Sequence, residues 1–436
     1  MKMDENKNVR RNGFREFIGG IIPFWRNPEY KWLKAAVYIG LIIHVAFFIS
    51  LSTYWWNPFF YNTSHYKVPQ ATDFFAVYLA GHDLASGGSI YTTATDHPGF
   101  GETVPYFYPF RYLPTAAYIG VALNAFNPWT AYWLWVVFYE ALFFTGILWL
   151  GYSFGTMRHL HIAAALYLFF TPWYPEIYMG QFNFLQSVFI LGMLITASSG
   201  RLLPSGVWWA LSVLWKVNTV ICFPALLRIR LWKPLIWLAL LIIITCGPYF
   251  LMHPGDASKF VLINFRLPGE SAENFPIHGL VTFGNYGFQG LIARLYFLVN
   301  FGGDTEPSFL PHAVSMIIFL LVSIWATIRA KDNRFPELLC LWVTTYFLVY
   351  TDVWEVQYVM LLPVIAYLYL KRPNIILWPI WLAMIFPSMH HGFYNIILPN
   401  WDLPFIKPVG SFALYIYCVY STMRNVVAVE PSPREL

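Results

Sequence analysis

Residues 35–54, AAVYIGLIIHVAFFISLSTY, form the first long apolar run and decide the class of the protein. The run contains no Lys, Arg, Asp or Glu, and about 20 such residues cross the hydrocarbon core of a bilayer as one helix. Basic residues precede it in the chain, and the positive-inside rule places them in the cytoplasm: Lys7, Arg10, Arg11, Arg15 and Arg26. The sequence therefore predicts a membrane span that leaves the cytoplasm at its N-terminal end.

The composition of the whole chain extends this prediction. Of 436 residues, 58% are hydrophobic, 20% aromatic and 11% charged, whereas about a quarter of a soluble domain is charged. This much apolar surface needs a bilayer as its solvent. The net charge of +5 lies mostly in short loops, so it reports topology, and we expect no nucleic-acid partner.

Apolar runs recur along the chain and predict an all-α integral membrane protein, a polytopic bundle of about twelve transmembrane helices with both ends inside. After the first span, they lie near 129–152, 161–176, 184–198, 204–216, 217–227, 234–252, 309–328, 336–350, 356–370, 375–388 and 409–424. The basic clusters between them fall in predicted cytoplasmic loops. We therefore expect a cytoplasmic segment 1–32, one membrane domain 33–428 and a cytoplasmic tail 429–436.

Two segments do not fit a simple count of spans. Residues 113–126 are apolar but short, and the charge pattern favours a helix that dips into the outer face or lies along it. Residues 204–227 are too long for one helix and too short for two full ones. Because Lys216 lies in the middle of this run, we expect two short helices that meet at the outer leaflet.

Two large loops, 55–127 and 253–308, lie on the extracytoplasmic side in this topology. The chain shows no cleavable signal peptide, so we expect a multi-pass protein of the plasma membrane whose polar site faces outward. The four cysteines lie in apolar runs without CxxC spacing and are typical of buried structural residues. Aromatic rings in the outer loops also suit sugars, because their faces stack on pyranose C–H groups.

Asp73 opens the segment DFFAVYLAGHDLASGGSIY, which follows the first span. The segment predicts a helix lying on the membrane, and the helix dipole at its N-terminal end favours an ionised carboxylate. Such a carboxylate can remove a proton from a sugar hydroxyl as a general base. The alternative is that Asp73 caps the helix.

Two cations are candidates for binding a phosphate group. Arg111 follows an aromatic cluster at the outer surface and can hold a phosphate through two hydrogen bonds, or anchor the chain at lipid headgroups. Lys216 interrupts an apolar run, which is costly unless the ammonium is paired or reaches the surface. A phosphate ester is one such partner.

Further polar and aromatic residues of the outer loops are candidates for binding substrate. Amides in the 180–183 turn can bind sugar hydroxyls or satisfy a helix end, and an acid such as Glu355 is functional unless an internal partner such as Arg294 makes it structural. The histidines His278, His390 and His391 lack the spacing of a metal site, so we expect no metal. The substrate-binding candidates are Tyr78, Tyr108, Tyr112, Gln181, Asn183, His278, Asn285, Arg294, Trp354, Glu355 and Gln357.

Five stretches together resemble glycosyltransferase family 87. The segment 73–91 and FYPFRYLP at 107–114 resemble the signature of that family's first loop. GQFNFLQ at 180–186, the run SGVWWALSVLWKVNTVICFPALL at 205–227 and GNYGFQGLIAR at 284–294 are similar to later family motifs and appear in the same order.

The resemblance implies a membrane glycosyltransferase of the GT-C fold. Asp73 is then the catalytic base, and Arg111 and Lys216 contact the donor phosphate. The donor is a polyprenyl-phosphate sugar (mannose or another hexose or pentose), the acceptor is a hydroxyl of a glycan or glycolipid, and transfer inverts the anomeric centre. No cofactor is expected. Two alternatives stay open: a polytopic transporter, and another lipid-linked glycan transferase or ligase.

Overall fold

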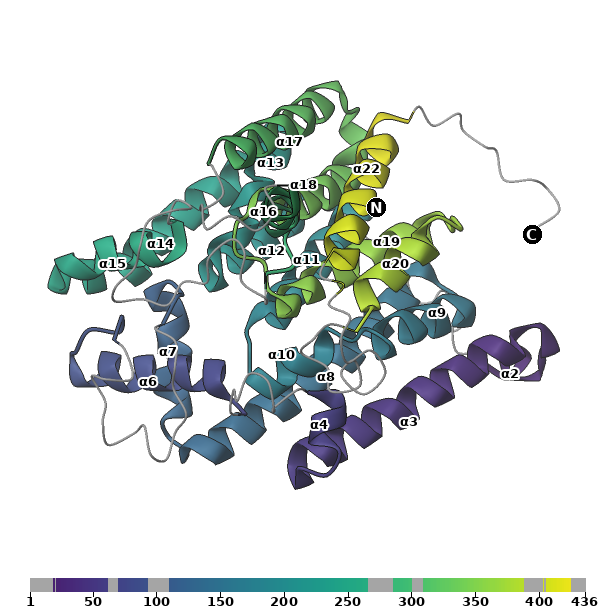
Figure 1. Cartoon of the computed structure of the whole chain (residues 1–436), viewed down its shortest axis with the longest axis horizontal. Helices are drawn as coiled ribbons and strands as arrows, with labels where there is room; N and C mark the ends of the chain where they lie inside the picture. Colours follow the sequence, from purple (N-terminus) through teal and green to yellow (C-terminus); the bar gives the residue numbers. More distant parts are fainter. Residues whose placement is uncertain are drawn as a thin grey trace, which may run out of the picture.

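The computed structural model of the chain describes residues 19, 21–61, 70–92, 110–265, 285–299, 309–387, 403 and 405–424. Throughout these residues the regular elements are helices (Figure 1). Some of them are short 3-10 helices, which are named η. One isolated antiparallel bridge joins Asn285 to Trp354. The all-α class predicted from the sequence is therefore confirmed for the described part of the chain.

The helices follow one another mostly with short connections. In chain order they are α2 (Ile21–Arg26), η1 (Pro28–Tyr30), α3 (Lys31–Thr53), α4 (Asn57–Phe60), α6 (Thr72–Ser86), α7 (Pro114–Leu123), α8 (Pro128–Phe154), α9 (Met157–Leu168), α10 (Trp173–Met179), α11 (Asn183–Ser198), α12 (Leu202–Trp215), η3 (Val217–Cys222), α13 (Phe223–Arg228), α14 (Trp232–Met252), α15 (Pro254–Phe265), α16 (Phe288–Val299), α17 (Phe309–Arg329), η4 (Asp332–Arg334), α18 (Phe335–Val349), η5 (Glu355–Leu361), α19 (Leu362–Lys371), α20 (Leu377–Ile385) and α22 (Ile406–Met423).

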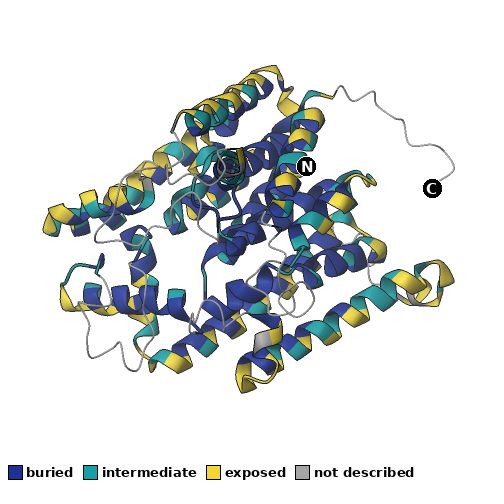
Figure 2. Cartoon of the chain, viewed as in Figure 1, coloured by how far each residue is buried: buried dark blue, intermediate teal, exposed yellow. Residues whose placement is uncertain are grey.

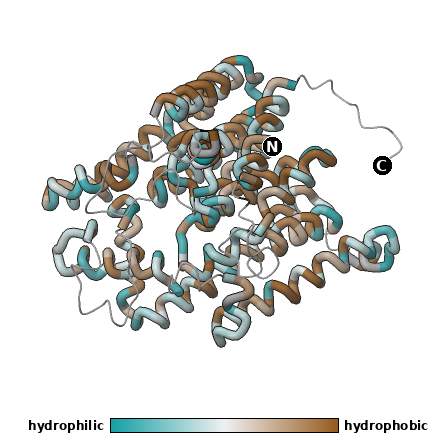
Figure 3. Tube along the Cα trace, in the orientation of Figure 1, coloured by the Kyte–Doolittle hydropathy of each residue, from teal (hydrophilic) through white to brown (hydrophobic). Residues whose placement is uncertain are grey.

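Four helices of the described residues have the length and composition to cross a membrane: Pro28–Thr53, Pro128–Phe154, Trp232–Met252 and Leu310–Arg329. Figure 3 shows long hydrophobic stretches along α3, α14 and α17. In the most apolar window of α14, 17% of the residues are buried inside the protein, so the rest of its surface suits lipid. The other predicted spans coincide with shorter helices, and the count of about twelve stays a prediction.

The predicted span 161–176 is divided between two helices. α9 ends at Leu168, and α10 begins at Trp173 with Pro172 as its N-cap residue. Proline has no backbone N–H, and its ring clashes with the carbonyl four residues earlier, so a helix does not continue through Pro172. The prediction of one continuous helix here is wrong. The turn directs α10, which carries Glu176, into the protein interior, where all its residues are buried.

The predicted break in the 204–227 run is confirmed. α12 ends at Trp215, and Lys216 adopts an extended conformation (φ −149°, ψ 123°) before η3 begins. The backbone carbonyl of Lys216 accepts a hydrogen bond of 2.8 Å from the Gln186 side chain. The chain therefore leaves the helical path at the lysine and holds that conformation with a partner from α11.

The interior of the bundle is built around α18. Its residues from Phe335 to Leu348 are all buried, as expected for a helix that is apolar on every side. Figure 2 shows the gradation from these buried central helices to outer helices such as α3 and α17, which keep an exposed face. That exposed face is apolar in α17, where Ile317 and Leu321 are among the exposed side chains. The outer helices therefore present a lipid-compatible surface.

Two glycines set the crossing of α6 and α7. A side chain at Gly81 would place its Cβ 2.0 Å from the backbone of Gly120, and one at Gly120 would lie 2.1 Å from the Val77 carbonyl oxygen. The two backbones therefore touch. α7 has ten residues and rises about 15 Å, half of the roughly 30 Å hydrocarbon core. It does not cross a bilayer alone, in agreement with the short helix predicted for 113–126, and it supports the helix that carries Asp73.

A polar pair joins two of the candidate spans. His44 Nε2 of α3 lies 2.7 Å from Glu140 Oε2 of α8, and both side chains are largely buried (6% and 14% exposed). We expect Glu140→Leu to destabilise the folded protein by about 1–2 kcal/mol, because the imidazole loses its partner inside the membrane. Thermal unfolding in detergent checks this. An unchanged melting temperature for Glu140→Leu would contradict a structural role for the pair.

Candidate active site

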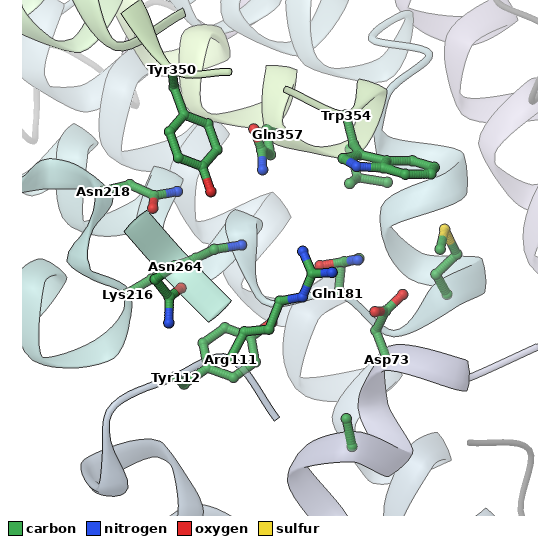
Figure 4. A pocket seen from close by; sticks show the side chains of 13 residues that line it. Asp73, Arg111, Tyr112, Gln181, Lys216, Asn218, Asn264, Tyr350, Trp354 and Gln357 are labelled. Carbon is green, nitrogen blue, oxygen red and sulfur yellow. The ribbon is translucent and has the colours of Figure 1, made fainter. Parts of the chain in front are cut away.

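One pocket of the described structure brings together half of the predicted site residues (Figure 4). It encloses about 780 Å³ of empty space, counted together with its open mouth. Seven predicted site residues line it: Asp73, Arg111, Tyr112, Gln181, Lys216, Trp354 and Gln357. Six lining residues were not predicted: Ala76, Met179, Asn218, Asn264, Tyr350 and Val356.

Asp73 lies in the first turn of α6 and points into this pocket. The N-cap residue is Ala71, and no side chain caps the helix, so the capping alternative for Asp73 is wrong. Gln181 is hydrogen-bonded to the Asp73 carboxylate. The carboxylate oxygen Oδ2 is buried and has no hydrogen-bond partner among the described residues. That oxygen is therefore available to a group that enters the pocket.

Burial controls the ionisation of this carboxyl group. It raises the pKa of Asp73 to about 6, while the charges of Arg111 and Lys216 and the hydrogen bond from Gln181 act in the opposite direction. The helix dipole was expected to keep the carboxylate ionised, and burial outweighs that effect. With a pKa of about 6, Asp73 is still mostly ionised at neutral pH and can accept a proton there.

A tight turn brings Gln181 to Asp73. Gly180 follows α10 in the left-handed conformation (φ 67°), and a Cβ at this position would lie 2.5 Å from the Phe74 side chain. A glycine is required here because the backbone is left-handed and because α6 approaches closely. The backbone N–H of Gln181 donates to the backbone carbonyl oxygen of Glu176 at 2.9 Å. The turn between α10 and α11 is therefore fixed against the helix that carries Asp73.

Arg111 is oriented by a carboxylate from a distant part of the chain. Its Nη1 lies 3.5 Å from Asp352 Oδ2, and 28% of the arginine side chain is exposed. The other Asp352 oxygen accepts a hydrogen bond of 2.8 Å from the Trp354 indole N–H. Asp352 thus holds the guanidinium and the indole on the same side of the pocket. A guanidinium carries five N–H donors in a fixed planar arrangement, and this arrangement matches the oxygens of an anion.

Lys216 extends into the pocket from the break between α12 and η3. Its ammonium donates to Asn183 Oδ1 at 2.5 Å and lies 5.5 Å from the centre of the Tyr112 ring. Burial, with the charge of Asp73 next in importance, holds the pKa of Tyr112 well above its usual range, so this phenol stays neutral. Figure 4 shows the lysine, Arg111 and Asp73 directed from different sides toward a common space. The pocket thus combines one carboxylate with two cations.

Five predicted site residues are described but do not line the pocket: Tyr78, Asn183, Asn285, Arg294 and Glu355. Tyr78 is buried and donates its hydroxyl to the Phe126 carbonyl oxygen at 2.8 Å. Glu355 pairs with the buried Lys407, 3.0 Å away. Arg294 belongs to α16 and is not among the residues that line the pocket.

Asn285 and Asn183 hold residues in place that lie beside the pocket or line it. The Asn285 amide donates to the Thr351 carbonyl oxygen at 2.6 Å, and this contact holds the chain just before Asp352. Asn183 contacts the Lys216 ammonium but is itself fully buried. Both amides thus orient groups that reach the pocket, although neither lines it.

Some predictions fall outside the described residues. Tyr108 and His278 lie there, as do His390 and His391. Among the residues that are described, no group of three or more His, Cys, Asp or Glu side chains could hold a metal ion.

The described part of the chain is thus all-α with helices of membrane length, and its pocket combines one carboxylate with two cations. The model of glycosyltransferase family 87 matches residues 110–351, slightly more than half of the chain, and the protein belongs to this family. The predicted resemblance is therefore confirmed, and the protein is a membrane glycosyltransferase. The match includes Arg111, Gln181 and Lys216, whereas Asp73 and Trp354 lie outside it. No curated protein matches the chain.

Proposed function

We propose that the protein transfers a sugar from a polyprenyl-phosphate donor to a hydroxyl group of a glycan or glycolipid. The supporting observation is one pocket in which a buried Asp73 oxygen without a hydrogen-bond partner faces the same space as two cations. The basic loops predicted for the cytoplasmic side leave α6 on the extracytoplasmic side, so transfer takes place at the outer face of the plasma membrane. Family membership sets aside the transporter alternative.

Arg111 and Lys216 bind the donor phosphate in this proposal. A guanidinium offers two parallel N–H donors to phosphate oxygens, and an ammonium acts as a compact positive charge. Both residues are already oriented, Arg111 by Asp352 and Lys216 by Asn183. Oriented donors stabilise charge as it develops without first having to reorganise.

The transfer step is a single displacement at the anomeric carbon. The acceptor oxygen attacks that carbon and gives its proton to Asp73 Oδ2. The bond between the anomeric carbon and the phosphate oxygen breaks, and its electron pair leaves with the lipid phosphate. Arg111 and Lys216 stabilise the charge that grows on the phosphate. Because attack and departure occur on opposite faces, the configuration inverts.

The sugar itself contacts the uncharged side of the pocket. Trp354 offers a ring face for stacking on sugar C–H groups, and its indole N–H is already bonded to Asp352. Gln357 and the unpredicted Asn218 and Asn264 add amides that can bind hydroxyls. These residues suit a neutral sugar ring.

The pH dependence of the rate tests the proposed base. Asp73 accepts a proton only when it is ionised, and its pKa is about 6. We therefore expect kcat/KM to rise with pH through about 6 and to fall by a factor of about ten for each pH unit below it. A series of initial-rate measurements between pH 4.5 and 8 checks this. A rate that is flat across this range would contradict Asp73 as the base.

A further inference from the structure

We propose that Glu176 is a positioning residue for sugar transfer, because it sets the orientation of the two amides that contact Lys216 and Asp73. This inference rests on the function proposed above for the lysine and the aspartate. Glu176 does not line the pocket, and its side chain is fully buried. It acts through Asn183 and Gln181, and it does not touch the substrate.

The Glu176 carboxylate lies at the N-terminal end of α11. Its Oε1 accepts a hydrogen bond of 2.6 Å from the Phe184 N–H, and its Oε2 accepts one of 3.0 Å from the Asn183 Nδ2 group. Backbone N–H groups at a helix start lack partners within the helix, so they need an oxygen acceptor from outside it. Both carboxylate oxygens are therefore fixed as acceptors.

This contact decides which way the Asn183 amide points. Because its Nδ2 donates to Glu176, its Oδ1 faces Lys216 and accepts from the ammonium at 2.5 Å. An ammonium group only donates hydrogen bonds. A flipped amide would put N–H groups against it and repel it. The carboxylate thus selects the one orientation of Asn183 that holds Lys216 in the pocket.

The same amide decides the orientation of Gln181. Asn183 Nδ2 also lies 3.3 Å from Gln181 Oε1, which accepts from it. The Gln181 N–H groups are therefore left to donate to the carboxylate of Asp73, with which Gln181 is hydrogen-bonded. A donor at this place favours the ionised form of Asp73. Glu176 is thus linked to Asp73 through the amides of Asn183 and Gln181. It is linked to Lys216 through the Asn183 amide alone.

The substitution Glu176→Gln tests this relay, by which we mean the hydrogen bonds from Glu176 through Asn183 to Lys216 and through Gln181 to Asp73. A glutamine at 176 has one acceptor oxygen in place of two, so if that oxygen keeps the Phe184 N–H, its NH2 group faces the Asn183 NH2 group. A compensating flip of Asn183 then turns the Asn183 N–H groups toward Lys216. We expect kcat/KM to fall about 10- to 100-fold, with a higher KM for the donor. The acid limb of the pH profile is expected to move to higher pH, because Asp73 loses its N–H donor.

Glu337→Gln is the matched control for Glu176→Gln. Glu337 is also a buried carboxylate, and it contacts Arg334 at 3.1 Å and Lys371 at 3.0 Å, all outside the pocket. It is expected to lower the melting temperature while kcat/KM and the acid limb stay at their wild-type values. If Glu176→Gln behaves in the same way, the relay is overturned.

A second variant, Gln181→Met, tests the branch that leads to Asp73. Gln181 is half-buried, and a neutral side chain of similar length leaves the charges facing Asp73, those of Arg111 and Lys216, in place. We expect the acid limb to move up by about one pH unit. If kcat/KM of Gln181→Met falls at the same acidic pH as that of the wild type, Gln181 does not control the ionisation of Asp73. This test holds even if Glu176→Gln does not fold.

Binding of farnesyl phosphate separates this inference from the proposed base. Measured in an Asp73→Asn background, its affinity reports on Lys216 and not on proton transfer. Glu176→Gln is expected to weaken binding about tenfold, and Gln181→Met to leave it unchanged. Unchanged binding with Glu176→Gln overturns the lysine branch. If Asp73→Asn itself transfers sugar normally, the proposed base is wrong, and the farnesyl phosphate result still decides the role of Glu176.

Discussion

Replacement of Asp73 by asparagine is expected to lower the rate of sugar transfer by at least about 1000-fold, because the pocket loses its proton acceptor. The fold should be retained, since an asparagine oxygen can accept the hydrogen bond that Gln181 now donates. Burial raises the pKa of Asp73 in the folded protein, so above pH 6 the ionised carboxylate destabilises the fold. The melting temperature of Asp73→Asn at pH 7.5 should therefore equal or exceed that of the wild type.

Asp83→Asn is the matched control for this variant. Asp83 is another buried carboxylate of α6, it accepts a hydrogen bond of 3.0 Å from Thr92, and it does not line the pocket. Its replacement should leave transfer near the wild-type rate. Turnover by Asp73→Asn within tenfold of the wild type would show that another group takes the proton.

Lys216→Met is expected to lower kcat/KM about 100-fold, because one of two charges that stabilise the leaving phosphate is removed. The KM for the donor should rise, since the lysine also binds the phosphate before the reaction. The positive charge of Lys216 lowers the pKa of Asp73, so its loss raises that pKa and moves the acid limb to higher pH. Initial rates at several donor concentrations and pH values measure all three effects.

The control for the lysine is Lys371→Met. Lys371 donates to Glu337 at 3.0 Å, and Glu337 keeps Arg334 as a partner when the lysine is lost. Donor KM and the pH profile should therefore not change in this variant. A wild-type KM for the donor in Lys216→Met would mean that the lysine is structural and that Arg111 binds the phosphate without it.

The apolar runs could be located from the sequence because hydrophobic length alone identifies a membrane helix. The break at Lys216 could also be predicted, since a lysine inside such a run requires a special environment. The division of 161–176 was missed although Pro172 and Pro175 lie within it. The apolar character of the run suggested one helix, but proline ends a helix in an apolar run as well.

The pocket was predicted less completely because it depends on contacts between distant segments. Arg111 and Asp352 are 241 residues apart, and no pattern in the sequence relates them. The 3-10 helix η5 directs Glu355 to Lys407 and leaves Trp354 in the pocket, so the two neighbours have different surroundings. Glu176 was missed, although an acid inside a predicted span was itself a signal of function.

In the proposed reaction a lipid monophosphate carries the sugar. The most direct test incubates the purified protein in nanodiscs with radiolabelled polyprenyl-phosphate sugars and a membrane lipid extract, with Asp73→Asn in parallel. We expect a labelled product from one of these donors with the wild-type protein and none with the variant. Well-folded wild-type protein that transfers label only from a nucleotide sugar or a lipid diphosphate, or from none of these donors, would contradict it.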